Sequence, residues 1–180
     1  LFPSVSDQLD LYEAGGLDLF DIWTLPLQER DQARQRNIAE YISLPDLSTF
    51  FMAFDVSRPP FDDLHVRRAF ALATDKGRLA NVIMRGCVAP ATGGLVPPGM
   101  PAHSAEIGLP YDPERARQLL AEAGYFNHNE PNFPFVEAIL PRGALIPYVD
   151  SLRMQWEESL GVELPWQVVE PASFSDRIRG

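Results

Sequence analysis

The chain has 180 residues, of which 46% are apolar and 22% are charged, the composition of a globular protein long enough to bury one core. Its formal net charge of −10 argues against a nucleic-acid partner and against docking on anionic lipid, because both need clustered Lys and Arg. Its apolar runs fall far short of the roughly 20 residues that a membrane-spanning helix needs.

The first predicted elements are a helix, a strand and a second helix. "SVSDQLDLYEAGG" reads as a short helix with Ser4 as a candidate cap and Gly15 and Gly16 as its stop. Residues 17–25, "LDLFDIWTL", are apolar on both faces, which predicts a strand in the middle of a covered sheet. Residues 27–36, "LQERDQARQR", are polar throughout and predict a surface helix.

Two further strands are predicted in residues 37–44, "NIAEYISL", and 47–55, "LSTFFMAFD". Both are rich in Phe, Tyr, Ile and Thr, which suit a pleated and largely buried surface. Only Pro45 and Asp46 separate them, so we expect them to pair as antiparallel neighbours.

A pair of short helices follows these strands. Pro59 and Pro60 end the last strand because proline cannot donate to a sheet, and Asp62 or Asp63 can cap the first helix. The apolar stripe of this helix consists of Val66, Phe70 and Ala73. Thr74 or Asp75 can cap the second helix, which we expect to end at Gly86. Its apolar residues are Leu79, Val82 and Ile83.

The next helix is the clearest in the sequence. Residues 91–110, dense in Gly and Pro, predict a long loop before it. In "YDPERARQLLAEAGY", Asp112 is the cap, Pro113 takes the first helical position and Gly124 is the stop. The stripe that we expect it to bury consists of Ala116, Leu119, Leu120 and Ala123.

The last third alternates strands and helices. Residues 133–140 predict a strand, and residues 144–161 predict a helix that ends at Gly161. Its apolar stripe consists of Val149, Leu152, Trp156 and Leu160. Residues 162–169 alternate with period two, with Pro165 placing this strand at an edge or a bulge. This alternation indicates an α/β domain, and without an evident linker we expect residues 1–180 to form one domain.

Both ends suggest an excised piece of a longer protein. The chain opens "LFPSVSDQ", without an initiator Met or a signal peptide. It closes on "SFSDRIRG", where Ser173 and Asp176 have the spacing of a capping box opening a helix of about one turn.

Catalytic and metal-binding patterns are missing from the sequence. His65, His103 and His128 stand apart, without the paired spacing of metal ligands, and Cys87 is alone at a helix end. Asp18 and Asp21 are three positions apart, so in a strand their side chains would point to opposite faces, which argues against a general acid–base pair. We therefore expect no catalytic residue, no metal and no cofactor.

Trp23 is the aromatic residue whose role stays open at this point. Trp156 and Trp166 lie on apolar stripes, which favours the core for both. Trp23 comes at the end of the predicted strand over residues 17–25, and ligand crevices in open α/β sheets lie outside strand ends. It therefore either packs inside the protein or lines a cleft.

The stretch from Phe50 to Tyr125 closely resembles the signature region of family 5 extracellular solute-binding proteins, the oligopeptide- and dipeptide-binding components of ABC importers. Its motifs occur in the family's order: Phe54-Asp55, Pro59-Pro60-Phe61-Asp62-Asp63, Val66-Arg67, Ala69-Phe70, Ala73 to Asp75, Gly86, Pro97-Pro98 and "YDPERARQLLAEAGY". Before and after them, "GGLDL" and "LGVEL" also resemble family motifs. One departure is Asp55, where the family usually has Asn, although either side chain can cap a turn.

The resemblance implies an α/β fold, with a mixed sheet covered by helices, as one lobe of a periplasmic-binding-protein-like (type II) fold. It also implies that residues 1–180 are an excised fragment covering much of the second, C-terminal lobe, without the first. Ligand contacts are then expected in the loops after strands, near Trp23, Thr24, Arg142 and Gly143.

The implied function is extracytoplasmic binding of a solute, with peptide as the first choice, by non-covalent capture between two lobes for import. The partners implied are that solute, the transporter permease and the missing first lobe, and any membrane contact would come through the transporter or a lipid anchor outside this fragment. No enzyme activity is expected. The alternatives are a family member for oligosaccharide or nickel chelate, or an α/β interaction module without a small ligand, which predicts a large exposed apolar patch.

Overall fold

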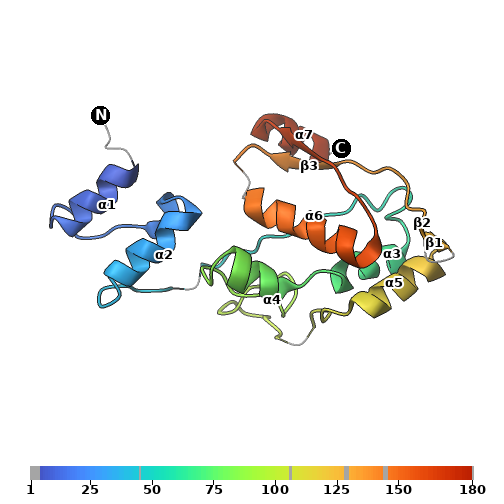
Figure 1. Cartoon of the computed structure of the whole chain (residues 1–180), viewed down its shortest axis with the longest axis horizontal. Helices are drawn as coiled ribbons and strands as arrows, with labels where there is room; N and C mark the ends of the chain where they lie inside the picture. Colours follow the sequence, from blue (N-terminus) through green and yellow to red (C-terminus); the bar gives the residue numbers. More distant parts are fainter. Residues whose placement is uncertain (1–4, 45, 106, 128–129, 144–145, 180) are drawn as a thin grey trace. The chain divides into compact units, whose positions relative to one another are not determined.

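The computed structural model describes residues 5–44, 46–105, 107–127, 130–143 and 146–179 (Figure 1). The sequence predicted one domain, whereas the contacts of the structure group the chain into two compact units, Leu1–Asp46 and Leu47–Gly180.

The first unit consists of two helices joined by a turn. Helix α1 spans Val5–Glu13, the 3-10 helix η1 spans Ile22–Thr24, and helix α2 spans Leu27–Arg36. Both predicted α-helices are confirmed, while Ser4, the candidate cap, lies outside the described residues. A small core holds the helices and the turn together; its buried members are Leu9, Leu25 and Ala33.

The strand predicted over residues 17–25 was wrong. Asp21 accepts a hydrogen bond from the backbone N of Trp23 at 2.9 Å, and Leu25 N donates to Ile22 O at 3.1 Å, so local bonds close a helical turn there. Leu19 is 85% exposed, although the strand prediction placed it in a covered sheet. A short acidic side chain that satisfies nearby backbone groups favours such a turn over a strand.

The strands predicted over residues 37–44 and 47–55 were also wrong. In the described residues of both stretches the backbone is irregular, and their large apolar side chains are mostly exposed, including Ile42 at 76% and Phe51 at 71%. A strand is stable only when a neighbouring strand takes up its backbone hydrogen bonds. Only the end of the second stretch packs inward, where Phe54 stacks on Phe61 with 4.6 Å between the ring centres.

Most of the regular secondary structure of the second unit is helical, as Figure 1 shows. Their bounds are Leu64–Leu72 for α3, Lys76–Arg78 for α4, Leu79–Ile83 for the π-helical turn η2, Pro113–Glu122 for α5, Ile146–Leu160 for α6 and Pro171–Arg179 for α7. Asp63, Asp75 and Asp112 each accept a hydrogen bond from a backbone N in the first turn, which confirms all three predicted caps.

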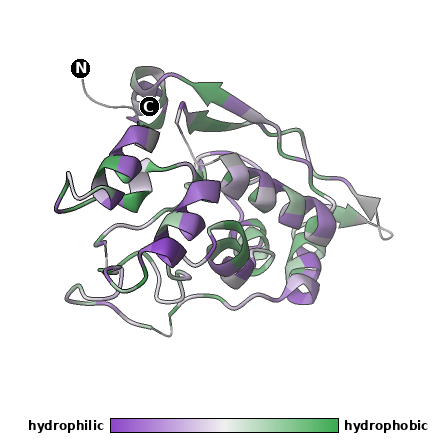
Figure 2. Ribbon diagram, turned by 60° about the vertical axis from the view of Figure 1, so that its left-hand side comes forward, coloured by the Kyte–Doolittle hydropathy of each residue, from purple (hydrophilic) through white to green (hydrophobic). Residues whose placement is uncertain are grey.

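The core of this unit lies between helices α3, α5 and α6. Phe70 is fully buried, and its ring centre lies 5.1 Å from that of Trp156 and 5.3 Å from that of Phe61. The indole N–H of Trp156 is satisfied by Phe70 O at 3.2 Å and Thr74 Oγ1 at 3.0 Å. Figure 2 shows these helices carrying both hydrophobic and hydrophilic residues, as expected for helices with one buried stripe and one wet face.

Val82 is an error in the predicted helical stripes of this unit. The stripe residues Leu79 and Ile83 pack into the core, but Val82 is 65% exposed. Met84 N donates to Leu79 O across five residues, so the turn is wider than the 3.6-residue period that the prediction assumed. Gly86 then ends the segment with φ of 72°, as predicted.

Two short strand pairs complete the second unit. Strands β1 (Phe126–Asn127) and β2 (Glu130–Pro131) pair antiparallel, and β3 (Ala138–Pro141) and β4 (Trp166–Val169) pair parallel. The strands predicted over residues 133–140 and 162–169 are thus confirmed in their second halves. Helix α7 begins at Pro171, so Ser173 lies inside the helix and the predicted capping box was misplaced.

The loop predicted over residues 91–110 contains no helix or strand in its described part. It folds back on itself, because Gly108 N donates to Thr92 O at 2.9 Å. A Cβ atom on Gly108 would lie 2.1 Å from that same oxygen, so only glycine allows this approach.

Candidate functional site

The first pair of predicted ligand contacts, Trp23 and Thr24, lies in the turn η1 of the first unit. The side chain of Asp21 holds Trp23 N, and Thr24 Oγ1 donates to Asp21 O at 2.7 Å. Leu25, next in the chain, is 2% exposed and anchors the turn in the small core. Trp23 itself is 40% exposed, so the turn presents the indole to solvent from a fixed backbone.

Arg30 of helix α2 supports this turn, and sequence reasoning missed it. Its guanidinium lies 4.3 Å from the centre of the Trp23 ring, a cation–π contact. Arg30 Nη2 donates to Trp23 O at 2.9 Å and Nε donates to Leu25 O at 3.0 Å. The polar composition of residues 27–36 predicted a surface helix and so hid this buried arginine; the available signal was the pair of apolar residues Leu27 and Ala33, three positions before and after it.

The second predicted pair, Arg142 and Gly143, follows the end of strand β3. Because β3 and β4 are parallel, the residues after both strands lie at the same edge, the edge where open α/β sheets bind ligands. Arg142 N donates to Val169 O at 2.8 Å, and Arg142 Nε donates to Glu170 Oε1 at 2.6 Å. Gly143 has φ of 92° and open space around it, so the backbone bends sharply without a side chain.

The two pairs belong to different units, Trp23 and Thr24 to Leu1–Asp46 and Arg142 and Gly143 to Leu47–Gly180. That they share one ligand therefore stays a prediction.

A hollow of about 560 Å³ lies in the first unit. Its polar rim is internally paired: Tyr12 donates from its hydroxyl to Glu40 at 2.5 Å, and the carboxylate of Glu13 contacts Arg36 and Asn37, each at 3.1 Å. The bond to Glu40 raises the pKa of Tyr12, because losing the phenolic proton would break it. The lining residues are Tyr12, Glu13, Gly15, Leu17, Asp18, Arg36, Asn37 and Glu40.

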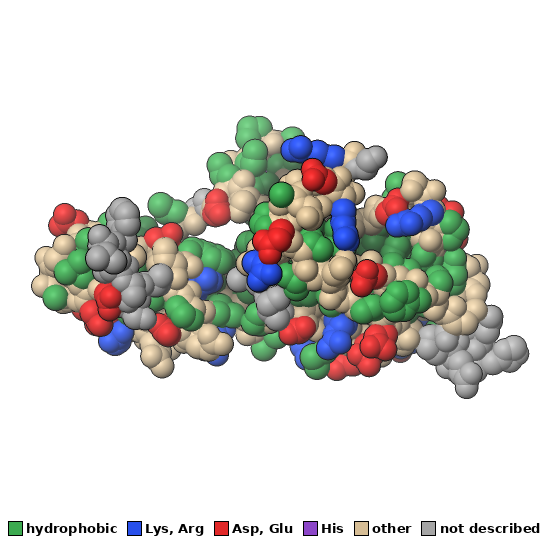
Figure 3. All heavy atoms as spheres, turned by 90° about the horizontal axis from the view of Figure 1, so that it is seen from above, with side chains coloured by type: hydrophobic (Ala, Val, Ile, Leu, Met, Phe, Trp, Pro, Cys, Tyr) green, Lys and Arg blue, Asp and Glu red, His purple; other side chains and the backbone are tan. Residues whose placement is uncertain are grey.

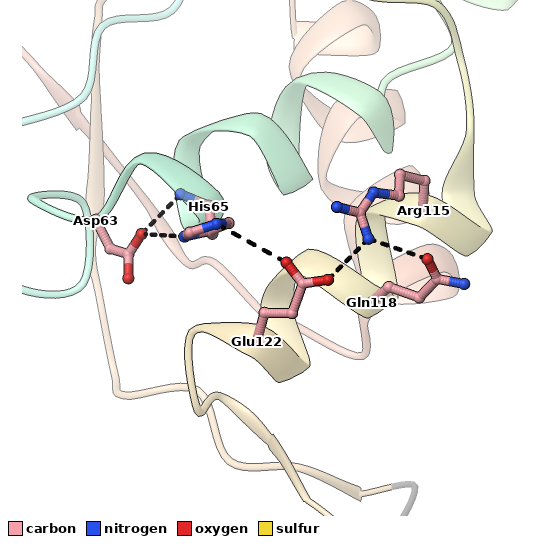
Figure 4. A network of polar contacts seen from close by, with 5 residues as sticks. All are labelled: Asp63, His65, Arg115, Gln118 and Glu122. Carbon is pink, nitrogen blue, oxygen red and sulfur yellow. Dashed lines mark hydrogen bonds and ion pairs between the residues drawn. The ribbon is translucent and has the colours of Figure 1, made fainter.

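A group of polar side chains joins the start of helix α3 to helix α5 (Figure 4). His65 Nδ1 lies 3.1 Å from Asp63 Oδ1, and His65 Nε2 lies 3.8 Å from Glu122 Oε2. Arg115 Nη1 contacts the other oxygen of Glu122 at 2.8 Å. These side chains are between 37% and 49% exposed, so the contacts contribute little energy and form no enclosed site for acid–base chemistry.

The described residues contain no group of three or more His, Cys, Asp and Glu placed to hold a metal ion. His103 instead makes a contact within its loop, with 2.7 Å between its Nδ1 and Val96 O, and His128 lies outside the described residues. On the face drawn in Figure 3, acidic and basic side chains are interspersed with hydrophobic ones, without a continuous field of one sign. In the part of the chain described, every helix is too short or too polar to cross a membrane.

Comparison with known proteins places these features in a family. The sequence profile described as bacterial extracellular solute-binding proteins, family 5 Middle, matches residues 2–179. Heme-binding protein A of Haemophilus influenzae is 39% identical over 99 residues, which are 53% of this chain and 18% of that protein. Glutathione-binding protein GsiB of Salmonella choleraesuis is 37% identical over 93 residues, 52% of this chain and 18% of that protein.

The fold also matches that of solved structures. A periplasmic oligopeptide-binding protein of an oligopeptide ABC transporter from Borrelia burgdorferi matches with a TM-score of 0.71 at 23% identity, covering 98% of this chain and 34% of that one. This likeness confirms the α/β, periplasmic-binding-protein-like (type II) fold class. The chain thus spans about a third of that structure. Since the family profile matches almost every residue, the chain belongs to the family 5 bacterial extracellular solute-binding proteins.

Proposed function

We propose that this chain is part of an extracytoplasmic protein that captures peptides and delivers them to the permease of an ABC importer. The observation that carries the proposal is the match of the family profile to residues 2–179. Of the relatives named above, one binds glutathione, itself a small peptide, and one is an oligopeptide-binding protein. The activity is non-covalent capture, followed by closure of two lobes, with no bond made or broken.

The chain corresponds, in this proposal, to much of the second of two lobes. The support is its coverage, 98% of this chain against 34% of the oligopeptide-binding structure. The exposed apolar side chains of residues 38–51 would then contact the rest of the longer protein. The alternative is an interaction module without a small ligand, in which the same exposed residues would contact a partner. It predicts that these residues stay exposed in the full-length protein.

Arg142 is the residue that we assign to an anionic group of the peptide, such as its terminal carboxylate. Its present partner is Glu170, and both side chains are more than half exposed, at 72% and 62%. An exposed ion pair contributes only about 0–1 kcal/mol, so an incoming carboxylate can replace Glu170 at small cost. Gly143 leaves room for a ligand beside it, because nothing lies within 4 Å of the position that a Cβ would take.

Native mass spectrometry of the full-length protein tests the proposal. The protein is mixed in turn with di- to pentapeptides, with oligosaccharides and with nickel chelates, and bound mass is recorded. We expect bound peptide, and less of it with Arg142→Gln than with the control Arg177→Gln, which removes an exposed arginine that donates a hydrogen bond to Gln167. Bound sugar or chelate alone would replace peptide as the ligand, and no bound mass from any pool would count against solute capture.

A further inference from the structure

We propose that Arg30 is a positioning residue that fixes Trp23 as an aromatic platform for a flat, uncharged group of the ligand. The inference rests on the proposed function, since it names the part of the peptide that this turn would select. Nothing in the sequence or in the family comparison assigns a role to Arg30.

The first argument is the way in which Arg30 is buried. It is 6% exposed, and among the described residues it forms no ion pair, while its Nη1 atom is buried without a hydrogen-bond partner. A buried cation without a carboxylate is unfavourable compared with an apolar side chain of similar size. Stability alone therefore does not account for an arginine at this position.

The second argument is what the guanidinium does for the turn. One planar group donates to the carbonyls of Trp23 and Leu25 and lies against the Trp23 ring, which only the fork of an arginine can do. Asp21 holds the backbone N of the same tryptophan. Trp23 is thus fixed at its N, at its O and on one face of its ring.

Trp23 is 40% exposed, and because Arg30 lies against one face of the ring, a ligand would stack on the opposite face. An aromatic group held in place before binding loses little freedom when a ligand stacks on it. Because a positive charge already lies behind the ring, a second cation on the open face would be repelled. The platform therefore favours aromatic or other flat neutral groups over Lys and Arg side chains.

Fluorine NMR of the full-length protein labelled with 5-fluorotryptophan tests the positioning step without any ligand. Trp23→Phe identifies the Trp23 resonance by its loss. We expect Arg30→Lys to move that resonance toward the position of free fluorotryptophan and to leave those of Trp156 and Trp166 in place. Arg34→Lys is the matched control, since Arg34 lies on the same helix but pairs with Asp31. An unchanged Trp23 resonance in Arg30→Lys overturns the inference.

Titration calorimetry tests the selectivity step with three peptide pools, rich in Phe and Tyr, in Lys and Arg, or in Gly and Ser. We expect Arg30→Lys to weaken binding of the aromatic pool by about 3- to 10-fold, with the other pools unchanged. Trp23→Ala, on an exposed side chain, should give the same selective loss if Arg30→Lys fails to fold. Equal loss for all pools would overturn the platform. If the wild type binds no pool, peptide capture has failed instead, and the NMR result alone decides the role of Arg30.

Discussion

The helices α3, α5 and α6 and the stretch of residues 37–55 are both rich in large apolar side chains, yet they end in opposite environments. Phe70 of α3 is fully buried, whereas Phe51 of the stretch is 71% exposed. The helices satisfy their own backbone groups and need only a second helix to cover one stripe. The stretch needs a neighbouring strand before it can fold, and the described residues offer none. Burial therefore follows from available partners and not from hydrophobicity alone.

The largest expected effect comes from truncating the buried ring. Phe70→Ala should lower the free energy of unfolding by about 3–5 kcal/mol, because the lost ring leaves a cavity beside Phe61 and Trp156. Phe51→Ala, the matched change in the exposed stretch, should alter it by less than about 0.5 kcal/mol. Urea denaturation of residues 1–180, followed by circular dichroism, measures both. Equal losses would mean that the stretch is packed after all, and the comparison would fail.

A smaller effect is expected at the cap of helix α5. Asp112 accepts a hydrogen bond from Arg115 N at 2.9 Å, so Asp112→Ala should lower the free energy of unfolding by about 0.5–2 kcal/mol. Asp150→Ala serves as the control, because this aspartate is exposed within helix α6 and not at a cap. The same urea titration compares them. A loss at Asp150 as large as at Asp112 would show that charge, and not capping, is responsible.

The smallest effect concerns Asp55, which ends the stretch. Hydrogen bonds from the side chain and backbone of Ser57, together with the nearby Arg58, lower the pKa of this carboxyl. Its contribution to stability is therefore present above its unfolded pKa and is lost as the pH falls through the lower folded value. Asp55→Asn should be less stable than the wild type at neutral pH, with the difference shrinking on acidification. Thermal unfolding at a series of pH values measures it.

The matched variant for this pH dependence is Ser57→Ala, which removes the largest cause of the lowered pKa. In the Ser57→Ala background, Asp55→Asn should cost less stability at neutral pH than it costs in the wild type. A difference that grows on acidification would have the wrong sign for this account.

Local signals explain how much could be predicted from the sequence. Helix α5 was predicted from cap to stop because Asp112, the apolar stripe and Gly124 are all read within one segment. The strands over residues 17–25, 37–44 and 47–55 were predicted wrongly because pairing depends on residues far away in the chain. The candidate site divides in the same way. Trp23 and Arg142 are predicted as ligand contacts from their places at the ends of predicted strands, whereas the contact of Arg30 with Trp23 was missed because it arises only when helix α2 packs on the turn.

The most direct test of the account is isothermal titration calorimetry of the full-length protein, with residues 1–180 in parallel, against a mixed pool of di- to pentapeptides. Because the proposed capture needs both lobes, we predict heat of binding from the full-length protein and little or none from residues 1–180. No heat from the full-length protein would contradict peptide capture, and equal heat from both would contradict the need for a second lobe.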